Sequence, residues 1–246
     1  MYEKFACVYD ALMASTPYDA WADYIDTALM RHFCGKKCEE ILVLDLACGT
    51  GAMALRLAET GYDVIGADAS EDMLAMAYRK AYDAGRQILF IRQDMRRLEL
   101  FGTVDAAVSV CDGLNYILDK EDLLAVFKRV RLFLNPGGIF IFDMNTEYKF
   151  KEMFGEKVLA GDGAGGEGYE WENFYDPDSQ INEYRLTFFS ADGEKFDEIH
   201  RQRAYPPMDI CNMLLDAGFS SAKISDCYSD NPPRTESWKV TFTAKT

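Results

Sequence analysis

Apolar runs alternate with amphipathic stretches along most of this chain. Apolar runs predict five strands, at Ile41–Ala47, Val64–Asp68, Ile88–Gln93, Val104–Val110 and Gly138–Asp143. Helical spacing between these runs predicts helices near 51–60, 71–84 and 120–134, with Gly61 and Gly137 placed as C-caps. Strands that are apolar throughout indicate a parallel sheet covered by helices on both faces, which is a doubly wound α/β fold.

The pattern changes on either side of this region. Residues 1–40 carry two helical stripes separated by Pro17. A Gly-rich stretch over 155–168 predicts a loop, and alternating residues then predict strands at Tyr169–Tyr175, Ile181–Phe189 and Lys195–Tyr205. A helix near 207–217 and strands near 222–228 and at Ser237–Ala244 resume the first pattern. We therefore expect a seven-stranded, mostly parallel sheet from 1–154 and 205–246, with an inserted three-stranded antiparallel sheet at 155–204.

The first strand ends in Asp45-Leu-Ala-Cys-Gly-Thr-Gly51 and runs directly into a helix. Glycines at such a turn let the backbone bend tightly and let a ligand approach it closely. A doubly wound fold binds its ligands outside the carboxyl ends of the strands. The turn therefore predicts a nucleotide-type site, but it does not identify the ligand.

A dinucleotide site is the first alternative. Gly49-Thr-Gly-Ala-Met-Ala54 satisfies the G-x-G-x-x-A pattern, and Asp68 follows at the spacing of the acid that binds a ribose. Asp45, however, would place a carboxylate against the pyrophosphate of a dinucleotide. A cofactor with a cationic amine and a sulfonium would be attracted by the same group. Asp94, after the third strand, is placed to accept a hydrogen bond from an adenine amine.

These motifs resemble those of the class I S-adenosylmethionine-dependent methyltransferases. The resemblance extends over Asp68 in Val64–Ser70, Asp94-Met95, Asp105–Ile117 and Leu134–Gly138, with Ala47 where many members have glycine. Tyr2-x-x-Phe-Ala-x-x-Tyr-Asp-x-Leu-Met13 and Glu198-x-His-x-Gln-Arg203 narrow it to small bacterial methyltransferases akin to glycine-type N-methyltransferases. The family implies S-adenosylmethionine as cofactor and S-adenosylhomocysteine as product.

The resemblance also implies the cofactor-binding residues. The cofactor would be lined by Ala47, Gly49 and Gly51, and its adenosine would be framed by Asp68, Ala69 and Met73. Its methionine portion would lie beside Val110 and Cys111. The set is completed by Asp45, Asp94 and Met95. Tyr9 would close over the cofactor, although a core aromatic residue on an amphipathic stripe has the same pattern. Cys48 and Cys111 are interpreted as small packing residues rather than nucleophiles.

Methyl transfer is an in-line displacement, for which alignment of the reactants supplies much of the catalysis. A base is needed only if the acceptor arrives protonated. Asn115 and Tyr116 could orient the acceptor or merely cap the following helix. His200 shares a strand face with Glu198 and Gln202, and it becomes the candidate base if that face meets the cleft.

Composition restricts the acceptor. The net charge of −15 disfavours a large nucleic acid, and the arginines at 79, 86, 92, 96 and 97 with Lys80 are interpreted as solvated faces. We expect a small molecule or a peptide, methylated on nitrogen, oxygen or carbon. The seven cysteines are scattered and the chain has two histidines, so no set of four metal ligands is formed. Cys34 and Cys38 lack a second Cys/His pair to complete a site, and no metal is expected.

The chain has no apolar run long enough for a membrane span and no signal-peptide pattern, so a cytoplasmic location is expected. Two other functions stay open on the sequence alone. One is an NAD(P)-dependent oxidoreductase, and the other is a non-catalytic protein that binds the cofactor for regulation. The oligomeric state is left undetermined.

Overall fold

The computed structural model describes residues 9–155, 158–162, 168–189 and 195–246. Parts of the sequence interpretation lie outside these ranges, namely Phe5 and Val8 of the first helical stripe and three glycines of the Gly-rich stretch, at 163, 165 and 166. Among the described helices, none is both long and apolar enough to cross a bilayer.

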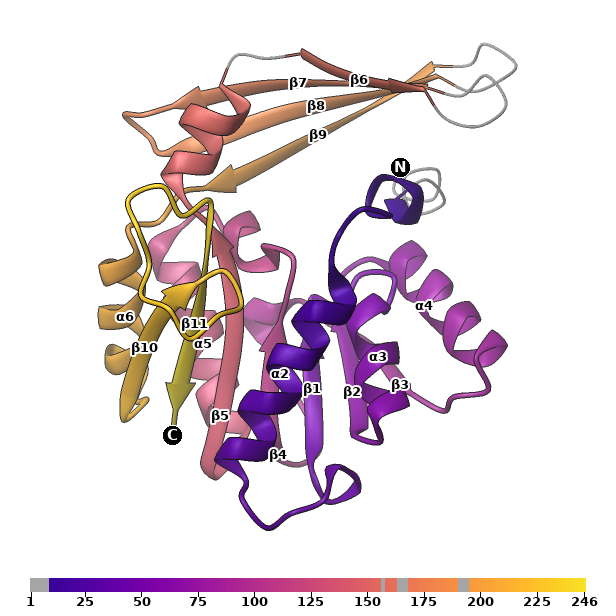
Figure 1. Cartoon of the computed structure of the whole chain (residues 1–246), viewed down its shortest axis with the longest axis vertical. Coiled ribbons are helices and arrows are strands. Elements are labelled where there is room, and N and C mark those ends of the chain that lie inside the picture. Colours follow the sequence, from indigo (N-terminus) through magenta and orange to yellow (C-terminus); the bar gives the residue numbers. More distant parts are fainter. Residues whose placement is uncertain (1–8, 156–157, 163–167, 190–194) are drawn as a thin grey trace.

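A seven-stranded sheet forms the centre of the fold, in the order β10-β11-β5-β4-β1-β2-β3 (Figure 1). Its strands are β1 (Leu42–Leu46), β2 (Asp63–Asp68), β3 (Leu89–Arg92), β4 (Val104–Ser109), β5 (Leu134–Asn145), β10 (Ser221–Asp226) and β11 (Lys239–Lys245). All neighbouring strands are parallel except that β11 runs antiparallel to β5 and to β10. The doubly wound prediction is therefore confirmed, and the chain reverses its direction of strand addition between β1 and β4.

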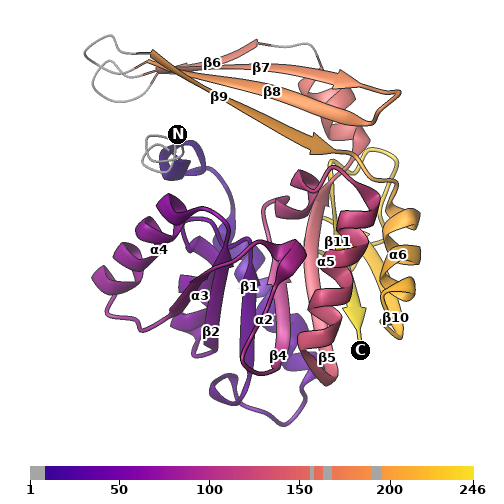
Figure 2. The same cartoon turned by 180° about the vertical axis from the view of Figure 1, so that it is seen from behind.

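Helices cover both faces of this sheet (Figures 1 and 2). They are α2 (Tyr18–His32), α3 (Ala52–Thr60), α4 (Glu71–Asp83), α5 (Lys120–Phe133) and α6 (Pro207–Asp216). Alternate residues of a strand serve opposite layers, because side chains of a strand alternate between the two faces. Val43 packs in the core beneath α2, α3 and α4, whereas Leu44 packs in the core beneath α5 and α6.

Helix ends follow local chemistry. Ser70 caps α4 by accepting the Met73 N–H at 3.3 Å, and Asp119 accepts the Glu121 and Asp122 N–H groups at the start of α5. Gly61 is the left-handed C-cap of α3, as predicted. The prediction for Gly137 is wrong: α5 ends at Phe133, and Gly137 is a left-handed residue near the start of β5.

The inserted sheet, our name for β6 to β9, follows β5 and a short helical segment, η4 (Lys149–Phe154). Its strands are β6 (Val158–Asp162), β7 (Gly168–Asp176), β8 (Ile181–Phe189) and β9 (Lys195–Arg203), antiparallel in that order. The three predicted strands are present. The stretch interpreted as a loop contributes a fourth, β6, because an edge strand with one partner needs little apolar periodicity.

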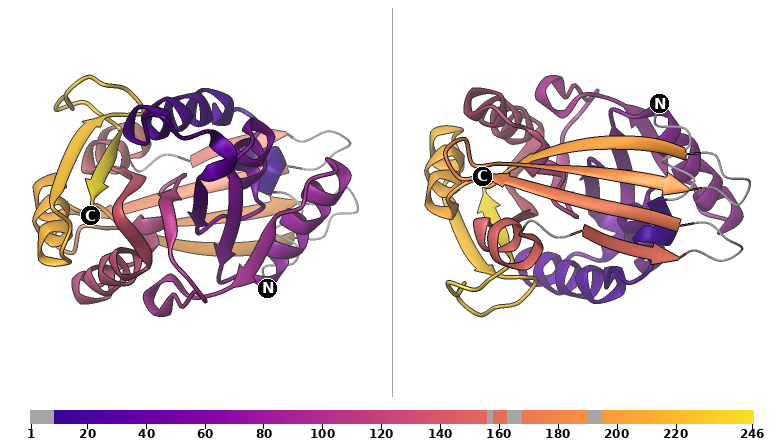
Figure 3. Two further views of the ribbon diagram at one scale, coloured as in Figure 1. Left: turned by 90° about the horizontal axis from the view of Figure 1, so that it is seen from below. Right: turned by 90° about the horizontal axis from the view of Figure 1, so that it is seen from above.

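The inserted sheet extends across the carboxyl-end edge of the central sheet (Figures 1 and 3). Tyr184, Leu186 and Phe188 of β8 are buried against Met73 of α4, and Tyr9 and Leu12 pack beside them. One side of the inserted sheet therefore faces the ends of the parallel strands. This arrangement encloses the space where a doubly wound fold binds ligands.

Candidate active site

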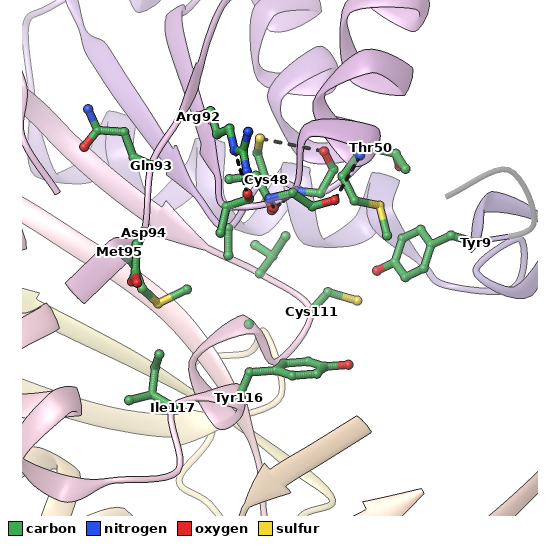
Figure 4. A pocket seen from close by; sticks show the side chains of 18 of the residues that line it. Tyr9, Cys48, Thr50, Arg92, Gln93, Asp94, Met95, Cys111, Tyr116 and Ile117 are labelled. Carbon is green, nitrogen blue, oxygen red and sulfur yellow. Dashed lines mark hydrogen bonds between the residues drawn. The ribbon is translucent and has the colours of Figure 1, made fainter. Parts of the chain in front are cut away.

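A pocket of about 930 Å3 lies between the carboxyl ends of the parallel strands and the inserted sheet (Figure 4). Most of the residues predicted for the site line it: Tyr9, Ala47, Gly49, Asp68, Ala69, Met73, Asp94, Met95, Val110, Cys111, Tyr116 and His200. Its size is near the upper end of the ~300–1,000 Å3 range of ligand pockets. The structure leaves three predicted residues, Asp45, Gly51 and Asn115, out of the lining.

The turn after β1 is shaped by three left-handed residues, Ala47 (φ 57°), Gly49 (φ 54°) and Gly51 (φ 75°). A Cβ added to Gly49 would meet nothing within 4 Å, so this backbone faces open space. Gly51 lies outside the pocket lining. Its added Cβ would lie 2.9 Å from the Ala77 Cβ, so this glycine allows α3 and α4 to pack closely.

Asp68 connects that turn to the next strand. One carboxylate oxygen accepts the Gly49 N–H and the other accepts the Ser70 N–H, both at 2.8 Å. Burial raises its pKa, and the backbone donors of Ser70 and Gly49 oppose the rise. Lone pairs remain on both oxygens for a ligand at the end of β2.

Asp45 lies behind the pocket wall rather than in it. The side chain is fully buried in β1, and neither carboxylate oxygen has a hydrogen-bond partner among the described residues. Burial raises its pKa to about 8; the Ala54 backbone N–H, which lies outside hydrogen-bonding geometry, opposes the rise, and Asp68 adds to it. The expectation of direct contact with the cofactor is not supported, because Asp45 does not line the pocket.

Asp94 lines the pocket and is held in place by Arg96. Its carboxylate accepts the Arg96 backbone N–H at 2.9 Å and pairs with the guanidinium at 2.6 Å. The Arg96 side chain is the main reason that the pKa of Asp94 is lowered. Arg92 and Arg96 both line the pocket, so our interpretation of these arginines as solvated faces alone was incomplete.

Tyr116 and His200 meet on the side beneath the inserted sheet. The Tyr116 hydroxyl lies 3.3 Å from His200 Nδ1 and 2.5 Å from the Tyr184 hydroxyl. The Tyr184 ring stacks on the His200 imidazole at a centroid distance of 5.0 Å. Burial lowers the pKa of His200 to about 4, so its imidazole is uncharged at neutral pH.

The face of β9 that carries His200 is the buried one. Glu198, His200 and Gln202 are buried, whereas Ile199 and Arg201 are exposed. His200 also lines the pocket, so its face of β9 is the one that meets the cleft.

Asn115 is a structural residue in this arrangement. Its amide nitrogen donates to the Asn145 and Arg203 carbonyls at 3.1 and 2.8 Å, and its amide oxygen accepts the Asn145 N–H at 2.9 Å. The side chain is fully buried and joins the end of β5 to the end of β9. The predicted contact of Asn115 with an acceptor is not supported.

Sequence reasoning missed several lining residues. Thr50 donates to Asp10 at 2.7 Å and accepts from Lys80 at 2.8 Å, which connects the first turn to α4 and to the N-terminal helical turn at 9–12. The Tyr18 hydroxyl lies 3.5 Å from the Cys111 Sγ. A Cβ on Gly113 would lie 2.9 Å from the Ala47 Cβ. Thr50 and Gly113 stood inside recognised motifs, whereas Tyr18 had no local signal.

Metal chemistry has no candidate ligand set in the ranges that the structure describes, where no cluster of three or more His, Cys, Asp or Glu residues could hold an ion. Cys34 is exposed, and the Cys38 Sγ lies 3.7 Å from the Met30 sulfur.

Comparisons with known proteins agree on one class of enzyme. A family model described as a methyltransferase domain matches residues 43–138. The chain is 38% identical over its whole length to a Bacillus subtilis (strain 168) protein named "Putative methyltransferase YqeM", of which it covers 97%. It is 31% identical to an S-adenosylmethionine-dependent methyltransferase from Clostridium acetobutylicum ATCC 824, whose crystal structure aligns with a TM-score of 0.84 over 99% of this chain and 98% of that one. A glycine/sarcosine N-methyltransferase of Halorhodospira halochloris is 31% identical over 137 residues, which are 52% of this chain and 51% of that enzyme.

Proposed function

The chain belongs to the class I S-adenosylmethionine-dependent methyltransferases, and from that premise we propose that it methylates a nitrogen atom of a small molecule or a peptide. Membership of this family decides against an NAD(P)-dependent oxidoreductase and against a protein that only binds the cofactor. The nitrogen specificity is our own inference, and it depends on the acceptor side of the pocket.

The residues present fit S-adenosylmethionine. Gly49 offers a backbone surface that no side chain covers, and Asp68 retains acceptor lone pairs at the end of β2 for ribose hydroxyls. Asp45 is buried behind this wall, and a cationic ligand in the pocket would favour the ionised form of its carboxyl. Asp94 would accept the adenine amine, and Val110 and Cys111 would lie beside the methionine portion. When bound, the cofactor supplies an electrophilic methyl group on its sulfonium.

The observation that supports a nitrogen acceptor is the uncharged imidazole of His200 beside the Tyr116 hydroxyl at the pocket wall. An amine must be unprotonated to attack a methyl group, and a neutral imidazole can accept a hydrogen bond from the N–H of such an amine. The net charge of −15 favours the approach of a cationic amine. The partial relative named for glycine and sarcosine N-methylation agrees with this chemistry.

Radiolabelled methyl transfer to the small-molecule and peptide fractions of a cell extract tests the proposal. One half of each fraction is treated with an amine-acylating reagent and then with hydroxylamine, which removes acyl groups from oxygen and leaves amines blocked. We expect transfer to the untreated half and loss of transfer in the blocked half. Equal transfer to both halves would show that oxygen or carbon is the acceptor.

A further inference from the structure

Cys111 and Asp112 form a strained turn after β4. Both have positive φ angles, 64° and 55°, which side chains other than glycine rarely adopt. The N–H groups of both residues donate to Asp143 of β5, each at 2.7 Å. Because Cys111 lines the pocket, the shape of this wall depends on a carboxylate that lies outside the pocket.

Asp143 is fully buried and Asp112 is half-buried, and the two carboxylates share one cation. Lys239 of β11 is 1% exposed, and its Nζ lies 2.9 Å from Asp112 Oδ1 and 2.5 Å from Asp143 Oδ1. The Tyr228 hydroxyl donates to the other oxygen of Asp143. Burial alone would lower the pKa of Lys239, but the two carboxylates outweigh it and raise the pKa. Removing one member of such a group leaves an uncompensated buried charge.

Asp112 also binds the inserted sheet. Its second oxygen accepts the Gln202 Nε2–H at 2.6 Å, and Gln202 is a buried residue of β9 on the same face as His200. One carboxylate therefore connects the turn at the pocket wall with the strand that presents His200. Asp112, Asp143, Gln202 and Lys239 themselves do not line the pocket.

We propose that these four residues are positioning residues for the methyltransferase. Lys239 and Asp143 hold the 111–112 turn in its strained shape against the bound cofactor, and Asp112 with Gln202 sets the place of β9 relative to that turn. The inference rests on the family's cofactor and not on the nitrogen acceptor proposed above. Binding of S-adenosylhomocysteine therefore tests it even if the acceptor proposal fails.

Charge balance supplies the first test. Calorimetry with S-adenosylhomocysteine should show at least a tenfold higher Kd for Lys239→Met, because the two carboxylates repel and the turn opens. The double variant Lys239→Met/Asp112→Asn removes one charge of each sign, and it should recover most of the lost affinity. A folded Lys239→Met variant with Kd within twofold of wild type, or a double variant no tighter than the single one, would overturn the proposal.

A second test leaves the three charged side chains in place and removes only the neutral donor, Gln202. Hydrogen exchange of 195–203 should slow when S-adenosylhomocysteine binds to the wild-type protein, and this protection should be lost in Gln202→Leu. The matched control is Asn182→Leu: Asn182 pairs with Gln202 across β8 and β9, is buried, and its amide donates within the inserted sheet, to Asn173 at 2.8 Å. The control should keep the protection. Protection retained in Gln202→Leu, or lost equally in the control, would contradict coupling through Asp112.

Discussion

Replacement of Asp45 by asparagine tests the electrostatic state of the buried carboxyl behind the pocket. In the folded protein the pKa of Asp45 is about 8 because burial penalises the charged form. In the unfolded chain an aspartate has a pKa near 3.9. Between these two values the folded protein holds a proton on Asp45 that the unfolded chain has released.

The sign and size of the effect follow from this difference. A carboxyl whose folded pKa is raised contributes most to stability below about pH 4, and this contribution falls by ~1.4 kcal/mol per pH unit until about pH 8. From pH 5 to pH 7 the wild-type protein should therefore lose about 3 kcal/mol of unfolding free energy relative to D45N, whose amide does not titrate.

Urea unfolding of both proteins at pH 5, 6, 7 and 8 measures this quantity. Taking the difference between the two proteins at each pH cancels the groups that they share, apart from Asp68, whose titration is coupled to that of Asp45. The free energy of unfolding of the wild type should rise relative to that of D45N steadily from pH 8 toward pH 5. A difference that is independent of pH, or one that favours the wild type more as pH rises, would refute a protonated Asp45.

Three further predictions concern the pocket. Asp68→Asn leaves one acceptor oxygen for two backbone donors, so the Kd for S-adenosylhomocysteine should rise about tenfold by calorimetry, and unchanged affinity would contradict the role of Asp68. Gly113→Ala places a Cβ 2.9 Å from Ala47 and should lower Tm by roughly 2–8 °C in scanning calorimetry, whereas Gly102→Ala, with open space around it, should not. Because burial lowers the pKa of His200 to about 4, the pH profile of kcat/KM with the identified acceptor should show no His200 titration between pH 6 and 8. The variant His200→Gln should lower kcat by about 100-fold without changing the shape of that profile. A titration near pH 6.5 in the wild type that is absent from the variant would contradict a neutral imidazole.

Much of the fold was predictable because its signals are local. Apolar runs and turn residues identified the seven strands of the central sheet, their helices and three strands of the inserted sheet. β6 was missed because an edge strand in a Gly-rich stretch has no distinctive pattern. Gly137 was misassigned because a glycine shortly after a helix can serve the following strand equally well.

The candidate site was predictable where one motif places a residue at a strand end. Asp68 and Asp94 line the pocket for that reason. Asp45 stands only two residues before Ala47, yet it belongs to β1 itself, and its side chain is fully buried. The sequence argument placed a negative charge against the cofactor, whereas the structure buries Asp45 behind the pocket wall, where burial raises its pKa to about 8.

The sequence by itself determined the class of cofactor site, because the first turn, the acids after the next strands and the spacing between them lie within one continuous segment. Tertiary structure decided which side chains share the pocket with that segment and which buried groups support the pocket wall. Lys239 and Asp112 are separated by 127 positions, and Tyr116 and His200 by 84. Such pairs form only when the sheet order places β11 beside β5 and the inserted sheet folds back over β4, and no periodicity along the chain encodes those distances.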